Sequence, residues 1–318
     1  MNVARFDPTE RFSREEMAAV RARSDLTGLM CVVHAWLVIA AAMAIYAIWP
    51  NPLTFIAAVI VIGSRQLGLA ILMHDAAHGV LMRTKGLNDP VSQWLCAYPV
   101  FTNTIPYRHY HLVHHRMTQQ PDDPDLHLSA KFPITRVSYR RKFIRDITGQ
   151  TGFKIRRAQI TNALGKPGEG FAARFATFRK RMGGMAAANL ILLAILTAFG
   201  KPHYYLMLWL LPLLTWQQVV TRIRNIAEHA MVPDNDDPMR NARTTYASWW
   251  ERAIFAPYWV NYHVDHHLLF YVPCFNLPKL HAMLLEKGYG PAMEIQKNYA
   301  AILKHAASKA PEPAPLAA

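Results

Sequence analysis

The sequence contains few cysteines and few acidic residues. Its three cysteines lie far apart and form no CxxC pair, which argues against a disulfide framework and against a thiolate metal site. The first 26 residues lack the apolar stretch of a cleavable signal peptide, so we expect none. Only 21 acidic residues accompany 35 Lys and Arg, which leaves a net charge of +14. We expect this positive charge to serve a membrane surface or an acidic protein, and no nucleic acid.

Apolar residues are plentiful, and they gather in four stretches of nearly membrane-spanning length: 29–49, 53–73, 184–200 and 203–221. About twenty helical residues cross a hydrocarbon core that is about 30 Å thick. The second stretch contains Arg65 and Gln66, and the fourth contains Gln217 and Gln218, whereas the other two hold no charge. We predict an all-α membrane protein with four transmembrane helices. A soluble all-α core is the alternative.

The distribution of positive charge predicts the orientation. Between Lys131 and Arg181, fourteen basic residues accompany only Asp146 and Glu169. By the positive-inside rule the four helices form two hairpins, and residues 74–181 and 222–305 form a helical cap on the cytoplasmic side. We therefore predict an integral, multi-pass protein, placed in the inner membrane if it is bacterial. The basic stretch also suits anionic headgroups or an acidic electron-donor protein.

Several shorter segments carry local predictions. Ser13 and Glu16 fit a capping box, which predicts a short helix along the membrane surface. Arg65 is expected to snorkel towards the interface. The apolar segment 90–106 is broken by prolines and is expected to be interfacial or re-entrant. Residues 1–305 form one predicted domain, and the Pro/Ala-rich tail 306–318 is predicted to be disordered.

Histidine is the most informative residue type, because nine of the fifteen histidines fall into four groups. These groups are His74 and His78; His111, His114 and His115; His229; and His263, His266 and His267. Intervals of three and four residues place side chains on one face of a helix. Imidazole is a common metal ligand. Nine imidazoles exceed the needs of one metal, whereas two metals with four or five ligands each would use them all.

The ligand type leaves the metal open, since imidazole suits zinc, copper, iron and nickel. Carboxylates beside such ligands commonly accept the second imidazole N–H, and we expect this role for Asp75 and Asp265. The Asp122–Asp125 run is predicted with equal weight as a plain turn. His109 is weighed as a further support of this kind, with a surface position favoured. His281 is predicted to be a packing or surface residue, and replacing it is expected to have little effect.

The ordered pattern HX3H, HX2HH, NX3H (Asn225 and His229) and HX2HH resembles the membrane fatty acid desaturases over residues 29–285. The segment HHLLFYVPCFNLPKLH is similar to that family's HHLFPxxPxxNLPxLH, with Leu269 and Phe270 replacing Phe-Pro. The resemblance implies a di-iron centre with the nine histidines as metal ligands and Asn225 reaching iron through water. It also implies that dioxygen and two electrons remove two hydrogens from methylenes of a lipid acyl chain.

Other features refine that resemblance. No HPGG haem motif is present, so electrons are expected from a separate ferredoxin-type or cytochrome b5-type donor. The HX3H spacing is more similar to acyl-lipid than to acyl-CoA desaturases. Trp94, Tyr98 and Phe101 are candidates for an apolar substrate tunnel. The alternatives are a di-iron lipid or carotenoid hydroxylase or ketolase and, more remotely, a membrane zinc hydrolase. The NLPKLH segment favours desaturation.

Overall fold

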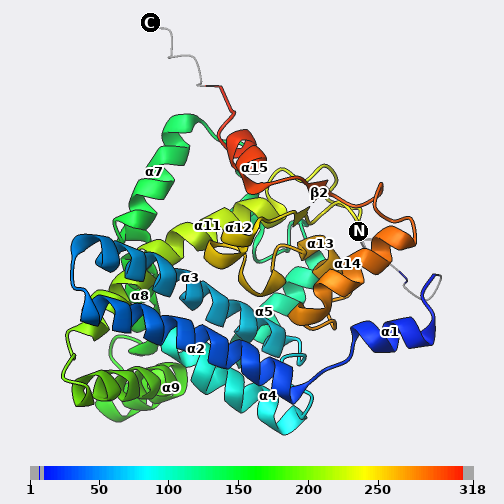
Figure 1. Cartoon of the computed structure of the whole chain (residues 1–318). Helices are drawn as coiled ribbons and strands as arrows, with labels where there is room; N and C mark the ends of the chain where they lie inside the picture. The colour runs from blue at the N-terminus through cyan, green and yellow to red at the C-terminus, as the bar shows by residue number, and fades with distance from the viewer. Residues whose placement is uncertain (1–6, 8–10, 311–318) are drawn as a thin grey trace, which may run out of the picture.

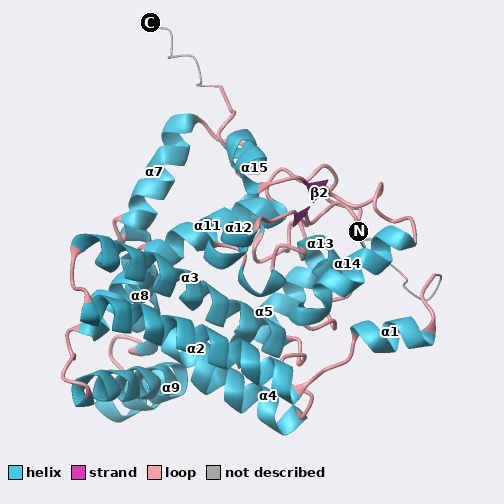
Figure 2. Ribbon diagram, in the orientation of Figure 1, coloured by secondary structure: helices cyan, strands magenta, loops and turns pink. Residues whose placement is uncertain are grey.

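The computed structural model describes residue 7 and residues 11–310, and it is mostly helical (Figure 1 and Figure 2). The α-helices up to the third long one are α1 (Arg14–Val20), α2 (Asp25–Ile48), α3 (Pro52–Ala77), α4 (Lys85–Ser92), α5 (Thr104–Met117), α6 (Leu126–Ser129), α7 (Arg136–Ile147), α8 (Gln150–Ala163) and α9 (Phe171–Ala198). Those that follow are α10 (Leu211–Leu214), α11 (Trp216–His229), α12 (Trp249–Ile254), α13 (His263–Leu268), α14 (Leu277–Glu286) and α15 (Tyr299–Ala306). Short π and 3-10 segments are η2 (Gln93–Ala97), η3 (Tyr98–Val100), η4 (Tyr205–Leu210), η5 (Pro257–Trp259) and η6 (Cys274–Asn276).

Strand structure in the described chain is limited to one pair, which modifies the all-α prediction only slightly. β1 (Thr244–Thr245) pairs in parallel with β2 (Ile295–Gln296). Thr244 also bridges Tyr262, the residue before α13. The bridge joins the segment after α11 to the residue before α13, so α11 and α13 are held close together.

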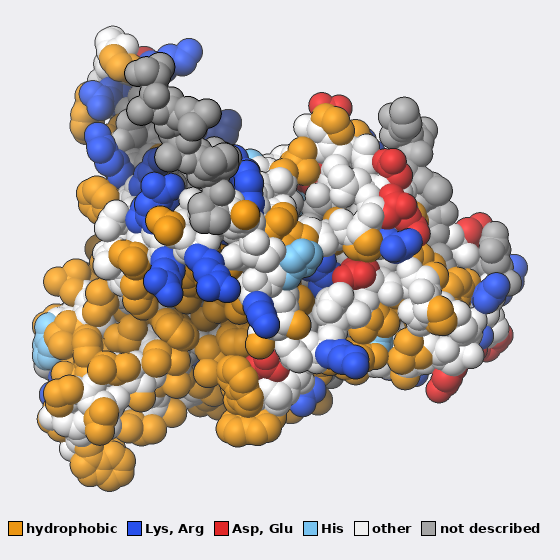
Figure 3. All heavy atoms as spheres, turned by 90° about the horizontal axis from the view of Figure 1, so that it is seen from above, with side chains coloured by type: hydrophobic (Ala, Val, Ile, Leu, Met, Phe, Trp, Pro, Cys, Tyr) orange, Lys and Arg blue, Asp and Glu red, His pale blue; other side chains and the backbone are white. Residues whose placement is uncertain are grey.

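Within the described residues, three helical segments are long and apolar enough to cross a membrane: residues 14–48, which include α2, then α3, and α9. The chain turns between α2 and α3 at Asn51, whose side chain accepts the N–H groups of Leu53 and Thr54. Pro52 follows at the first helical position, where a missing N–H costs nothing. Hydrophobic side chains cover one end of the molecule, with Lys and Arg along the border (Figure 3). α9 begins earlier than predicted and includes part of the basic stretch.

The fourth predicted span, 203–221, is broken into shorter pieces. η4 is a π-helix, α10 follows, and the helix is interrupted at Thr215, where φ is −116° and ψ is −88°. Pro212 lies within α10 and lacks the N–H that a continuous α-helix would use. The apolar run is thus present, but Pro212 stands where the π-helix gives way to α10, and the break at Thr215 separates the run from α11.

Two other expectations meet a different structure. Arg65 does not reach outward; it is 6% exposed and donates a hydrogen bond to the carbonyl of Ala253, beside the ring of Tyr258. Helix α1 has the predicted capping box, with Ser13 and Glu16 making both bonds. However, α1 packs on the cap, because Val20 is fully buried and its carbonyl accepts from the side chain of Asn276.

The segment 90–106 forms short helical pieces rather than one helix. α4 runs into η2 and η3, and this part of the chain packs against α3 and α9. The predicted tail begins too early, since Ala306 ends α15, is fully buried and accepts the N–H of Ile134. Residues 311–318 lie outside the described residues.

Candidate metal centre

Four helices bring the nine histidines of the sequence pattern together. The last turn of α3 supplies His74, and its C-cap residue is His78. The other seven come from α5 (His111, His114 and His115), from the end of α11 (His229) and from α13 (His263, His266 and His267). All nine belong to the interior, because their ring atoms meet one another between these helices. The helical spacing of three and four residues explains why each box presents its rings to one side.

The nine rings form two groups. The five-histidine cluster consists of His74, His78, His111, His115 and His266, and the four-histidine cluster consists of His114, His229, His263 and His267. Within each cluster the candidate ligand atoms lie within 4.8 Å of one another. The two clusters adjoin, since the ring centroids of His115 and His267 are 4.3 Å apart. Two neighbouring metals could therefore be bound with one cluster each, one by five imidazoles and the other by four.

The ring nitrogens are arranged as a metal site requires. Nε2 of His229 lies 2.8 Å from Nε2 of His263, and Nε2 of His111 lies 2.9 Å from Nε2 of His115. Both nitrogens of His74 and His78, together with Nδ1 of His111 and His115, are buried without a hydrogen-bond partner in the described chain. Buried polar atoms without partners are costly. A cation bound by converging lone pairs removes that cost, so these residues fit a metal.

Burial also keeps these imidazoles in the form that binds metals. Desolvation lowers the pKa of His111, His115 and His266 well below the ordinary value, and neighbouring histidines lower it further. The same causes lower the pKa of His263 and His267. A neutral imidazole has a free lone pair, whereas the protonated ring has none. The cluster therefore presents lone pairs at neutral pH.

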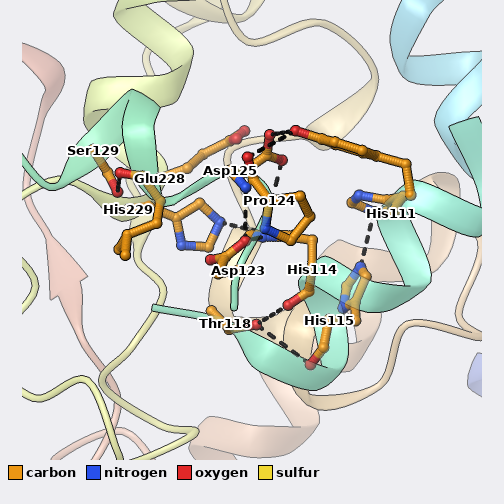
Figure 4. A network of polar contacts seen from close by, with 12 residues as sticks. His111, His114, His115, Thr118, Asp123, Pro124, Asp125, Ser129, Glu228 and His229 are labelled. Atoms are coloured by element: carbon orange, nitrogen blue, oxygen red, sulfur yellow. Dashed lines mark hydrogen bonds and ion pairs between the residues drawn. The ribbon is translucent and has the colours of Figure 1, made fainter. Parts of the chain in front are cut away.

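The four-histidine cluster is supported by acceptors from the surrounding loops (Figure 4). Nδ1 of His114 donates to a carboxylate oxygen of Asp123 at 2.8 Å, and Nδ1 of His229 donates to the carbonyl of Asn241 at 3.2 Å. Burial would raise the pKa of Asp123, but its bond with His114 and two backbone N–H groups hold it below the ordinary value. Each acceptor fixes the proton on Nδ1, which leaves Nε2 for the cluster. The sequence predicted a plain turn and a carboxylate partner of the histidines with equal weight for the Asp122–Asp125 run, and Asp123 is such a partner.

The two aspartates inside the boxes behave differently from the prediction. Asp265 is fully buried, but it accepts from Nδ1 of His281 at 2.8 Å and from the hydroxyl of Thr244 at 2.6 Å rather than from a box histidine. Asp75 accepts the N–H of Cys274 at 2.7 Å, and its other oxygen lies 3.8 Å from Nδ1 of His74. Both carboxylates therefore join the boxes to neighbouring segments. His281 is a buried partner of Asp265, which its place in the NLPKLH segment could have suggested.

Asn225 lies at a small cavity beside the four-histidine cluster. The cavity is lined mainly by polar groups, among them Asn225, Arg224, Asp125 and Glu228. Burial raises the pKa of Glu228, although the ion pair with Arg224 opposes that effect. One oxygen of Glu228 lies 3.6 Å from Nε2 of His263. The cavity gives water and small polar molecules a place beside the four-histidine cluster, and His111 of the other cluster also lines it.

Other predicted residues lie away from the clusters. His109 is exposed on α5, so the surface position is the correct one. Tyr98 and Phe101 pack with Met182 and Met185 of α9, and Trp94 is 46% exposed. These aromatic residues are not among those that line the cavity beside Asn225.

The helical fold and its paired histidine clusters define a protein with a candidate two-metal centre beside long apolar helices. The profile of the family described as fatty acid desaturase matches residues 49–297, a range that contains all nine histidines, and the chain belongs to this oxidoreductase family. The chain is also 27% identical over 239 residues to dihydrorhizobitoxine desaturase of Bradyrhizobium elkanii. That match covers 73% of this chain and 66% of the relative, just under two thirds of its length.

Proposed function

We propose that the chain is an O2-dependent di-iron desaturase that introduces a C=C bond into the acyl chain of a membrane lipid. The observation that carries this proposal is the division of nine clustered imidazoles, seven of them buried, into adjoining groups of five and four. Membership of the fatty acid desaturase family supports the metal and the reaction class. The nine histidines are the proposed ligands. Asn225 is proposed to hold a water beside the iron of the four-histidine cluster.

We further propose that the chain crosses the membrane four times in two hairpins. Segment 205–214 supplies the fourth crossing together with the residues around its break. The charge of the loop 131–181 supports a cytoplasmic position for the cap. His74 lies nine residues after Arg65, which is about 13 Å along a helix, so the centre stands above the apolar part of α3.

The proposed reaction converts –CH2–CH2–, O2, two electrons and two protons into –CH=CH– and two molecules of water. Iron held by these histidines would activate O2, which is the oxidant that unactivated C–H bonds require. Burial keeps His111 and His266 neutral by lowering the pKa of each ring, and Asp123 accepts the Nδ1 proton of His114. Glu228, Asn225 and Arg224 surround the cavity through which water and protons reach the centre. The two electrons come from a separate donor of the ferredoxin or cytochrome b5 type.

Expression in a host without desaturases, followed by mass spectrometry of its lipids, tests the proposal. We expect acyl species that are two hydrogens lighter, and we expect them to be missing with His266→Ala. Products that have gained an oxygen atom would show a hydroxylase or ketolase instead. Purified protein that contains zinc and acts without a reductant would show a hydrolase. Soluble metabolites should be profiled too, because one relative is named for dihydrorhizobitoxine; an unsaturated metabolite with unchanged lipids would overturn the lipid substrate.

A further inference from the structure

Helix α8 has an apolar and basic face whose side chains are largely exposed. Phe153, Arg157, Ile160 and Leu164, which follows the helix, lie at intervals of three or four residues and therefore share one face, called here the α8 outer face. Phe153 is 63% exposed, Ile160 45% and Leu164 42%. Lys154 flanks this face and is exposed. Large exposed apolar groups beside basic ones are typical of interfacial helices.

The contacts on the other side of α8, which faces the protein, show where the helix lies. Near its first turn, a Cβ on Gly152 would come within 2.4 Å of the carbonyl oxygen of Leu214, so the helix touches the backbone just before the break at Thr215. The side chain of Trp216 in turn bonds to Ser64, the neighbour of Arg65 in α3. The beginning of α8 thus lies level with the residues where the apolar parts of two segments end.

The far end of α8 is fixed at a similar level. Arg181 of α9 donates to the carbonyl of Asn162, and Ala163 packs with Met182 and Met185. In α9 the basic residues end at Arg181, and the apolar run begins at Met182. Both ends of α8 are therefore attached where a long apolar segment meets polar residues. The axis of α8 runs along this boundary rather than across it.

We propose that the α8 outer face is a membrane-surface anchor that inserts Phe153, Ile160 and Leu164 between lipids and binds anionic headgroups through Lys154 and Arg157. The proposal rests on the proposed membrane insertion of the long helices. Exposed apolar residues of neighbouring segments, such as Leu206 and Leu190, continue the apolar surface towards the bilayer. An acidic partner protein would account for the charges but not for apolar groups aligned at the boundary. Arg157 can extend its guanidinium towards phosphate while its stem covers apolar surface.

Spin labels in the full chain, reconstituted in phosphatidylcholine nanodiscs with phosphatidylglycerol, test the insertion. Phe153→Cys and Ile160→Cys are labelled in a Cys31→Ala background, since the other two cysteines are buried. Lys279→Cys is the matched control, because it is exposed on α14 at the opposite end of the molecule (Figure 1). We expect the α8 labels to be relaxed by dissolved oxygen more than by a water-soluble nickel complex, and the control label to show the reverse. Full nickel accessibility at residue 153 would overturn the anchor.

Lipid retention tests the headgroup preference. We expect Lys154→Gln with Arg157→Gln to lower the apparent affinity for phosphatidylglycerol in native mass spectrometry by about tenfold. Lys279→Gln with Lys297→Gln should leave it unchanged. If lipid retention stays constant while binding of an acidic ferredoxin falls, the face docks a protein and the anchor is wrong. Neither measurement depends on turnover, so a chain without desaturase activity could still confirm the anchor.

Discussion

The two histidine clusters are neighbours, but their surroundings differ. In the four-histidine cluster, loop groups hold the imidazoles from behind: Asp123 accepts from His114, and the Asn241 carbonyl accepts from His229. In the five-histidine cluster, His74 and His78 have no such acceptor within the described residues. One site therefore depends on its surroundings for ring orientation, whereas the other depends on the helices themselves.

The clusters also differ in access. The cavity with Asn225 and Glu228 opens beside the four-histidine cluster, and it includes His111 as the nearest member of the other group. Four imidazoles leave room for an exchangeable ligand, while five fill more of the coordination sphere. With metals bound as proposed, the four-histidine cluster would therefore have more room for an exchangeable ligand such as water than the five-histidine cluster.

Removing one ligand from each cluster has the largest expected effect. His263→Ala and His266→Ala should each abolish product, because the proposed reaction needs both irons. Iron content should separate them: His263→Ala leaves three imidazoles in its cluster, and His266→Ala leaves four, so the first loses more iron. Iron per chain is measured by plasma mass spectrometry, with His109→Ala as the surface control. Full activity in either variant would contradict the ligand assignment.

Asp123→Asn tests the hydrogen bond by which Asp123 orients the ring of His114. The amide is neutral and holds the His114 proton less firmly, and loss of such a partner commonly costs 10–100-fold in metal affinity or activity. We expect a decrease within that range in turnover, with loss of iron from one site only. Asp122→Asn is the control, since Asp122 is exposed. Unchanged iron binding would mean that His114 is oriented by α5 alone.

Asn225→Ala tests the difference in access. We expect turnover to fall by about tenfold, the effect of losing one hydrogen bond to a bound water. Both irons should remain, because the histidines are intact. The measurement is turnover per iron, and Asn235→Ala on the exposed loop is the matched control. Loss of iron in Asn225→Ala would instead make this residue a direct ligand.

The sequence predicted well which histidines come together, because helical spacing alone brings His111 and His115 to one face. It predicted the partners of those ligands poorly. Asp265 stands inside a box, yet its direction is decided by packing against α14, which the sequence does not display. The fourth span is not one regular helix, because Pro212 cannot donate to the preceding turn and the backbone breaks at Thr215, and hydropathy registers neither feature. Arg65 donates to the carbonyl of Ala253 in α12 and does not reach solvent. This tertiary contact cannot be predicted from hydropathy.

His281 is where sequence and structure give opposite expectations, and its replacement should have the smallest effect on turnover. His281→Ala leaves the buried carboxylate of Asp265 with Thr244 as its remaining partner. An unmade bond of this kind costs about 1–3 kcal/mol. We therefore expect a lower melting temperature, followed by tryptophan fluorescence in detergent, while product still forms at moderate temperature.

A double-mutant cycle shows whether that loss arises from the pair. Asp265→Asn alone should also lower the melting temperature, and adding His281→Ala should cost less than it does in the natural chain, because the two side chains interact directly. If the two losses simply add, His281 stabilises the cap through packing alone. In that case α13 keeps its three histidines aligned without the Asp265–His281 bond, and both clusters depend on their helices more than on their surroundings.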